Sequence, residues 1–245
     1  MSISVFVTKD FAQLSEVAAA IAVRKTIGIL KNKNEAVLGL ATGNSPTGLY
    51  KHFARAANEG KLDAGRIRSF NLDEYVGLPG ENAQQRLLHP ESYAYFMIQE
   101  LFGRLQKKFI ETRVPAGSLI DQKILIRELR ENKNDWEFRG TDAGKSIVIK
   151  PRPKSAYLAW IKKDILDGYE RKIKAAGGID LQIIGVGGRG HVAFHESGIP
   201  FAGSRVLLVK LDDNTIANAV ADGHFKTKAQ SPQYAVSMGA ELVYR

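Results

Sequence analysis

Hydrophobic residues follow two periodicities along this chain, and each predicts a different kind of element. Short apolar or alternating runs predict β-strands, and apolar residues three and four positions apart predict helices. The predicted strands lie at residues 3–8, 36–42, within 66–75, 179–187 and 205–211. The predicted helices lie at about residues 10–33, 46–59, 90–101, 119–136 and 154–176, with Asp10 as the N-cap of the first.

The order of these elements predicts the fold class. Strands that alternate with helices form a parallel sheet with helices on both faces. We therefore expect an α/β protein with a Rossmann-like, doubly wound, mostly parallel sheet. No repeat, low-complexity tract or break in composition marks a second domain, so residues 1–245 are predicted to form a single domain.

The composition narrows the class of protein. Of the 245 residues, 44% are hydrophobic and 25% are charged, as in a water-soluble globular protein. No apolar run approaches the ~18 residues that span a bilayer, and the N-terminus lacks the features of a signal peptide. The absence of cysteine excludes disulfides and thiolate sites. We expect a cytoplasmic enzyme or binding protein with no membrane partner.

The net charge of +9 raises the question of a nucleic-acid partner. Most Lys and Arg residues are interspersed with acidic residues, as on a helix surface with pairs of opposite charge. Only residues 147–155 form a dense basic segment, and it lacks aromatic side chains for base stacking. The charge therefore favours an anionic small molecule or solubility over nucleic acid.

Three loops follow predicted strands, where ligands gather in doubly wound sheets. The first loop comprises Thr42, Gly43, Asn44 and Ser45 and leads into a helix. Ser45 is its predicted N-cap, and the proline that follows fits the first helical position. The free N–H groups of such a terminus bind phosphate. An ordinary strand-to-helix turn is the alternative.

The second segment has two adjacent carboxylates, Asp73 and Glu74, which end an apolar predicted strand. Adjacent strand residues point to opposite sides, so only one of the two is expected to face a pocket. A carboxylate in that position could serve as the base for a C–H proton. The alternative is a helix cap or a turn residue.

The third loop is IIGVGGRGHVAFHESG, residues 183–198. Gly185, Gly187 and Gly190 have the G-x-G-x-x-G spacing of a dinucleotide-binding loop. The helix that such a site requires is interrupted by Gly198, Pro200 and Gly203. A nicotinamide cofactor is therefore not expected.

The polar residues of this third loop suggest a different chemistry. His191 is a candidate acid or base, and Glu196 is a candidate partner that orients it and stabilises its charge. A buried, hydrogen-bonded histidine beside the glycine turn is the structural alternative. His191 and His195 have the spacing of ligands on a metal-binding helix, but no H-E-x-x-H motif follows, so no metal is expected.

Together, these loops resemble the glucosamine-6-phosphate deaminase/isomerase family, which is related to the 6-phosphogluconolactonases. The segments that carry the resemblance are LGLATGNSPTGLYKHF, FNLDEYVGL followed by HPESYAYFM, IDLQIIGVGGRGHVAFHESG, LDDNTIANA and PQYAVSMG. They stand in the family's order and cover nearly the whole chain. Residues 80–88 and 120–155 look longer than in typical members. FNLDEYVGL and HPESYAYFM are similar to the deaminase branch rather than to the lactonases.

The resemblance implies a role for each candidate residue. Asp73 would move the proton of the substrate from C2 to C1, and His191, with Glu196 behind it, would open the pyranose ring. Water would then attack the C2 imine and release ammonia, without a metal or an organic cofactor. The residues implied in binding the sugar phosphate are Thr42, Gly43, Asn44, Ser45, Gly187 and Gly188.

The chain departs from the family pattern at two residues. Arg189 stands where the family has an aspartate before the catalytic histidine, and it is a further candidate catalytic residue. An arginine close to the imidazole would lower the pKa of His191, unless the arginine points away. Val220 replaces an arginine that contacts the phosphate. The candidate replacements for that cation are Arg205, Lys210 and Lys226.

A third departure is that the chain ends before the family's last strand and helix. With these departures, three functions stay open. The first is isomerisation and deamination of an amino-sugar phosphate, such as glucosamine 6-phosphate. The second is hydrolysis of a sugar lactone, in which His191 activates water. The third is binding of a sugar phosphate by a non-catalytic regulator. The oligomeric state is also open, with a homo-oligomer among the expectations.

Overall fold

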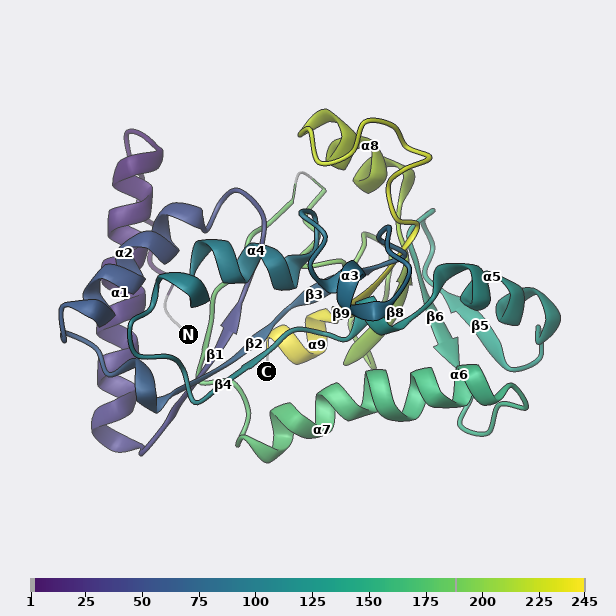
Figure 1. The fold of residues 1–245 in the computed structure, drawn as a ribbon, viewed down its shortest axis with the longest axis horizontal. Helices are drawn as coiled ribbons and strands as arrows, with labels where there is room; N and C mark the ends of the chain where they lie inside the picture. The colour runs from purple at the N-terminus through teal and green to yellow at the C-terminus, as the bar shows by residue number, and fades with distance from the viewer. Residues whose placement is uncertain (1–2, 188, 245) are drawn as a thin grey trace.

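The computed structural model describes residues 3–187 and 189–244, and its strands form two sheets (Figure 1). The first sheet has four parallel strands in the order β4-β2-β1-β7. These strands are β1 (Ala36–Leu40), β2 (Ile67–Asn71), β4 (Glu111–Arg113) and β7 (Leu181–Gln182). The predicted α/β class with a parallel sheet is therefore confirmed.

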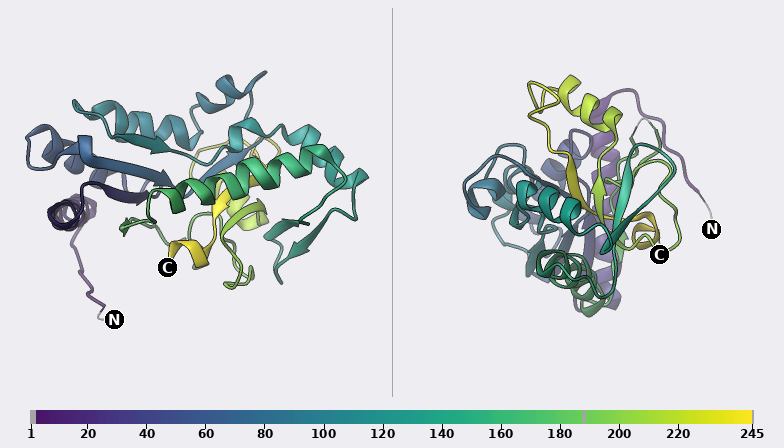
Figure 2. Two further views of the ribbon diagram at one scale, coloured as in Figure 1. Left: turned by 90° about the horizontal axis from the view of Figure 1, so that it is seen from below. Right: turned by 90° about the vertical axis from the view of Figure 1, so that its right-hand side faces the viewer.

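Helices cover both faces of this sheet, because alternate residues of β1 point to opposite sides. Leu38 and Leu40 pack with apolar residues of α1, α2 and α4, whereas Val37 packs with Tyr169 and Ile173 of α7. The bounds of these helices are α1 (Phe11–Asn32), α2 (Thr47–Asn58), α4 (Tyr93–Glu100) and α7 (Asp167–Ala175). Seen from below, α7 runs across the front of the molecule, and α1 lies at one end (Figure 2).

The second sheet, in the order β3-β9-β8-β6-β5, is antiparallel throughout and was not anticipated from the sequence. Its strands are β3 (Asp73–Val76), β5 (Trp136–Arg139), β6 (Lys145–Ile149), β8 (Val206–Lys210) and β9 (Tyr234–Met238). The predicted strand at 205–211 lies here rather than in the parallel sheet. The helix predicted at 119–136 is the shorter α5 (Gln122–Glu131), and the β5–β6 hairpin follows it.

A single residue, Leu72, joins β2 of the parallel sheet to β3 of the antiparallel sheet. Its N–H donates to the carbonyl of Leu40 in β1 at 3.2 Å, and its carbonyl accepts from the N–H of Met238 in β9 at 2.6 Å. The next residue is Asp73. The junction of the two sheets therefore places this carboxylate at the carboxyl end of the parallel strands.

Further helices connect and flank the sheets. The helix predicted at 154–176 consists of α6 (Ala156–Trp160), the π-helical turn η4 (Ile161–Leu166) and α7 in direct succession. The remaining elements are the helices α3 (Ala83–Leu87), α8 (Asp213–Ala221) and α9 (Ala240–Val243), with the 3₁₀ turns η1 (Ala64–Arg66), η2 (Phe102–Arg104) and η3 (Gly117–Leu119). In the part of the chain that the structure describes, no helix combines the length and the apolarity needed to cross a membrane.

The strand predicted at residues 3–8 is not formed. The described part of this segment has no regular structure up to Thr8, and Ile3, Val5, Phe6 and Val7 are between 60 and 94% exposed. The alternating pattern has the period of a strand, but a strand also needs a neighbour to pair its backbone groups. The predicted N-cap that follows is correct, because the Asp10 carboxylate accepts from the N–H of Gln13 at 2.8 Å.

Candidate active site

The first loop leaves β1 and turns into α2. Gly43 has a φ of +90°, which only glycine adopts readily. The predicted cap differs in detail: Pro46 occupies the N-cap position, α2 begins at Thr47, and no side chain caps the helix. The N–H groups of the first turn of α2 therefore have no capping side chain, as a phosphate site at a helix terminus requires.

The two adjacent carboxylates on β3 point to opposite sides. Asp73 lines a cavity beside the first loop, and the Thr42 hydroxyl donates to it at 3.4 Å. Glu74 points away from the cavity and accepts four hydrogen bonds at 2.8–3.0 Å, three of them at the start of α4. The donors to Glu74 are the N–H groups of Tyr75, Tyr93 and Ala94 and the hydroxyl of Ser92. One carboxylate thus faces the pocket, and the other anchors a helix.

These surroundings shift the pKa of both carboxylates. Burial, together with the charge of neighbouring Glu74, raises the pKa of Asp73 to about 8, although one long hydrogen bond from Thr42 acts in the opposite direction. Burial also raises the pKa of Glu74, to about 7, while its hydrogen-bond donors favour the ionised form. Asp73 is therefore a desolvated carboxylate with few donors, which makes it a stronger base than an exposed aspartate.

The third loop folds back on itself before His191. The N–H of Gly187 donates to the carbonyl of His191 at 2.9 Å, and the N–H of Gly190 donates to Gly187 at 2.8 Å. In the described residues no helix follows this turn before α8, as the glycines and the proline between residues 198 and 203 predicted. Both Gly187 and His191 line the cavity with Asp73. The predicted ligand-binding residue Gly188 lies outside the described residues.

Two further residues of the third loop, Ala193 and His195, differ in their relation to the cavity. Ala193 lines the cavity with a φ of 52°, a left-handed backbone that costs a non-glycine residue free energy and is found at functional sites. His195 instead has a structural role. Its Nδ1 accepts from the N–H of Ala240 at 3.1 Å, so its Nε2 carries the proton and donates to the carbonyl of Ile199 at 3.0 Å.

Glu196 does not pair with His191 in the described residues. Its carboxylate is 3% exposed and accepts from the N–H of Asp212 at 3.1 Å and from the hydroxyl of Thr215 at 3.0 Å. Asp212 and Thr215 belong to the start of α8, where free N–H groups and the helix dipole attract a negative charge. The expected histidine–glutamate pair is therefore replaced by a contact that holds α8 against the loop.

Arg189 points away from the cavity. Its guanidinium donates to Asp142 at 3.0 Å and to Asp212 at 3.2 Å, and it does not line the cavity. Of the two alternatives for this arginine, the structure shows the one in which it turns away. The carboxylate that holds it, Asp142, comes from the hairpin between β5 and β6, and no sequence pattern linked these segments.

The cavity has a volume of about 260 Å³ and combines polar groups with an aromatic wall. Tyr93 and Phe194 stack with ring planes 8° apart, and Asp222 lies at the end of α8. No local sequence pattern marked these three residues as part of a site. The described lining residues are Ala41, Thr42, Gly43, Ser45, Leu72, Asp73, Tyr93, Gly185, Val186, Gly187, His191, Ala193, Phe194 and Asp222.

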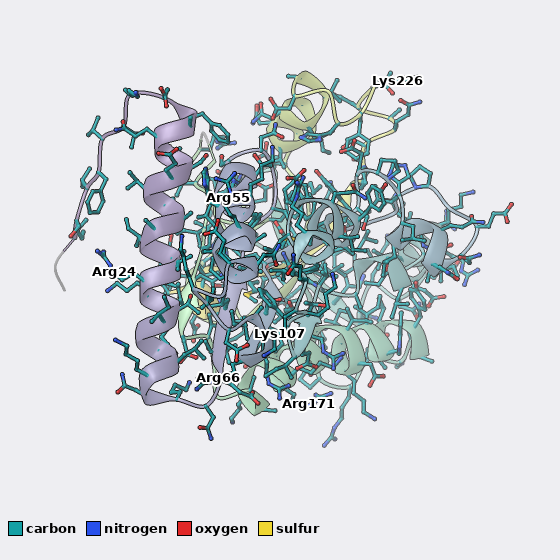
Figure 3. All side chains as sticks on the ribbon, turned by 60° about the vertical axis from the view of Figure 1, so that its left-hand side comes forward. Arg24, Arg55, Arg66, Lys107, Arg171 and Lys226 are labelled. Atoms are coloured by element: carbon teal, nitrogen blue, oxygen red, sulfur yellow. The ribbon has the colours of Figure 1, made fainter. Side chains whose placement is uncertain are left out.

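The predicted phosphate-binding cations lie elsewhere, as does Asn44, which is exposed. Arg205, just before β8, pairs with Glu170 of α7 at 2.9 Å, and Lys210, at the end of β8, lies 5.9 Å from the ring centroid of Phe138. Lys226 extends outward from the loop after α8 (Figure 3). Among the described lining residues there is thus no Lys or Arg, and within the described chain no group of three metal-ligating side chains was found.

Comparisons with known proteins agree with the fold. No protein-family model matches the chain. It is 32% identical over 239 residues to the glucosamine-6-phosphate deaminase of Clostridium botulinum (strain Loch Maree / Type A3), covering 98% of this chain and 76% of that protein. It is 33% identical over 234 residues to the glucosamine-6-phosphate deaminase of Clostridium beijerinckii, covering 95% and 74%.

Solved structures show the same fold. A monomeric glucosamine-6-phosphate deaminase superposes with a TM-score of 0.69 at 24% identity, over 98% of this chain and 78% of that one. The 6-phosphogluconolactonase of Thermotoga maritima has a TM-score of 0.57 at 17% identity, over 96% and 76%. The fold is thus an α/β fold that this chain shares with both of these solved structures. The chain belongs to the glucosamine-6-phosphate deaminase family, a family of enzymes.

Proposed function

We propose that this protein isomerises and deaminates a 2-amino-2-deoxyhexose 6-phosphate, converting glucosamine 6-phosphate or a close analogue to fructose 6-phosphate and ammonia. The observation that carries the proposal is that Asp73, which is buried, and His191 line one cavity with three residues of the first loop, Thr42, Gly43 and Ser45. The family relationship supplies the substrate class.

Asp73 is the proposed base. Its ionised carboxylate takes the proton from C2 of the open-chain sugar, the electron pair forms the C1–C2 double bond, and the C1 carbonyl oxygen takes up a proton from water to give an enol-amine. Return of the proton to C1 leaves an imine at C2. Water then adds to that carbon, the C–N bond breaks, and ammonia leaves while the ketose carbonyl forms. No redox partner is needed, because C1 is reduced as C2 is oxidised.

His191 is the proposed catalyst of ring opening. The reaction needs a proton removed from the C1 hydroxyl and a proton delivered to the ring oxygen, and an imidazole can do both near neutral pH. His191 is half-buried and lines the same cavity as Thr42, Gly43 and Ser45 of the first loop. The stacked rings of Tyr93 and Phe194 offer an apolar surface for the sugar.

The phosphate is proposed to bind the loop between β1 and α2. The backbone N–H groups that follow Gly43, the hydroxyls of Thr42 and Ser45, and the dipole of α2 all favour an anion there. The cytoplasmic location and the assembly into a homo-oligomer stay predictions from the sequence.

An assay of ammonia and ketose phosphate formed from the gluco and galacto amino-sugar 6-phosphates tests the proposal. We expect equal amounts of both products from at least one epimer. Hydrolysis of a sugar-phosphate lactone without ammonia release would instead assign the lactonase function. Binding of the sugar phosphate with no product by NMR would assign the regulator.

A further inference from the structure

The turn before His191, at Gly187 and Gly190, differs from the segment after His191 in the hydrogen bonds that its backbone makes. After His191, the N–H of Phe194 donates to the hydroxyl of Ser237 in β9 at 3.0 Å. Before His191, the backbone hydrogen bonds that the described residues make stay within the turn, between Gly187, Gly190 and His191. Among the described residues, the backbone of the turn is therefore held only by these local hydrogen bonds.

The side chain of Arg189 connects this turn to other elements. Its guanidinium donates to Asp142 Oδ2 at 3.0 Å and to Asp212 Oδ2 at 3.2 Å. Asp212 is buried and caps α8, and Asp142 belongs to the turn between β5 and β6. The arginine thus joins three segments that are far apart in the sequence.

The turn between β5 and β6 is itself held by hydrogen bonds to Gly198, in the part of the third loop that follows His191, and to Asp212. The N–H of Thr141 donates to the carbonyl of Gly198 at 3.1 Å, and the N–H of Gly144 donates to Asp212 at 3.4 Å. A Cβ at Gly144 would lie 2.7 Å from the Glu196 side chain, so the hairpin packs directly on it. Asp142 therefore lies in a turn that hydrogen bonds and packing hold in place.

We propose that Asp142 is a positioning residue that holds the glycine turn, and with it His191, through Arg189. The proposal rests on the proposed function in one respect, namely that His191 opens the sugar ring. It explains the substitution at position 189, since the arginine finds its carboxylate partner in the hairpin at residues 136–149. The ion pair acts on the position of the imidazole and touches no substrate.

The variant Asp142→Asn keeps the size of the side chain and removes its charge. We expect kcat to fall about fivefold, while KM changes by less than about twofold because the phosphate loop is untouched. The pair is partly exposed, so salt screens it. The kcat of the wild type should therefore fall with ionic strength toward that of D142N, which should respond less.

Three further variants separate positioning from general damage. Arg189→Gln also removes the bond to Asp212, so it should lower kcat at least as much as D142N, and the double variant should lose no more than R189Q alone. Asp142→Glu should recover most of the kcat. Glu137→Gln removes an exposed carboxylate from the same hairpin and should leave kcat and its salt dependence unchanged.

Hydrogen exchange at the amides of Gly187 and Gly190 measures how firmly the ion pair holds the turn, and it needs no catalytic activity. We expect exchange at least about fivefold faster in D142N and R189Q than in the wild type or E137Q. If the wild type releases no ammonia, the proposed function fails while the exchange data still test the ion pair. An exchange rate equal to that of the wild type in both D142N and R189Q would overturn the proposal. If the wild type is active, an unchanged kcat in both variants would also overturn it.

Discussion

Asp73 and Glu74 show how adjacent carboxylates acquire different roles. Because side chains alternate along a strand, one carboxylate is expected to face a pocket and the other to face away. In β3, Asp73 faces the cavity and Glu74 faces away from it. Asp73 has one long hydrogen bond, from Thr42, and Glu74 has four shorter ones. The environment, rather than the residue type, therefore makes Asp73 the candidate base.

The raised pKa of Asp73 predicts the acid side of the pH profile. A base must be ionised, so kcat/KM should fall about tenfold per pH unit below the pKa of about 8 and level off above it. Initial rates between pH 5 and 9, in buffers of constant ionic strength, check this. A profile that is flat down to about pH 5 would contradict the burial argument, because an exposed aspartate titrates near 4.

The sequence predicted some residues of the site and missed the pairing of others. Asp73 and His191 could be found because each follows a strand of the parallel sheet closely in sequence, where local patterns are informative. The partners of Glu196 and Arg189 could not, because Asp212 and Asp142 are brought to them by tertiary structure. The role of each candidate residue in catalysis stays a prediction.

At the scale of elements, the carboxylate of Glu74 fastens α4 to β3. It accepts from the N–H groups of Tyr93 and Ala94, which are unpaired at the start of a helix, and from the hydroxyl of the N-cap Ser92. Tyr93 lines the cavity beside Asp73, so this contact sets the distance between the base and the aromatic wall.

Glu74→Gln should therefore have two effects. The amide group cannot accept all four hydrogen bonds, so the protein should lose about 1–3 kcal/mol of unfolding free energy. Loss of the neighbouring charge should also move the acid side of the kcat/KM profile to lower pH. Urea unfolding and pH–rate profiles measure both. Glu100→Gln on the same helix should cause neither effect, and an unshifted profile in E74Q would count against the coupling.

The parallel strands and their helices were predictable because buried apolar runs and helical periodicity are local signals. β1, α1 and α2 lie close to their predicted positions. The antiparallel sheet was not predictable, because β3, β8 and β9 pair across long stretches of chain. The change of sheet occurs at Leu72 within one continuous predicted strand, so the sequence offered no boundary there.

At the scale of the whole molecule, the N-terminal segment contributes little to packing. The apolar side chains between Ile3 and Val7 are at least 60% exposed, whereas α1 packs on the parallel sheet through Ala19 and Ala22. The apolar alternation of this segment misled the strand prediction, because a strand requires a paired neighbour.

Removal of residues 1–8 should leave the thermal midpoint within about 1 °C and the activity unchanged, since the N-cap Asp10 is retained. Asp10→Ala in the intact chain is the contrasting variant and should cost about 1 kcal/mol. Calorimetry of both compares them directly. A clear fall in the midpoint after the deletion would show that the segment packs on the protein in solution.

The central claim is that Asp73 moves the C2 proton, and solvent-proton exchange tests it most directly. With glucosamine 6-phosphate in D₂O, NMR of the wild-type reaction should show deuterium at C1 of the ketose product or exchange at C2 of the substrate. Asp73→Asn should slow both this exchange and ammonia release about 10²–10⁴-fold, while sugar-phosphate binding persists. Ammonia release by D73N at the wild-type rate would contradict the account.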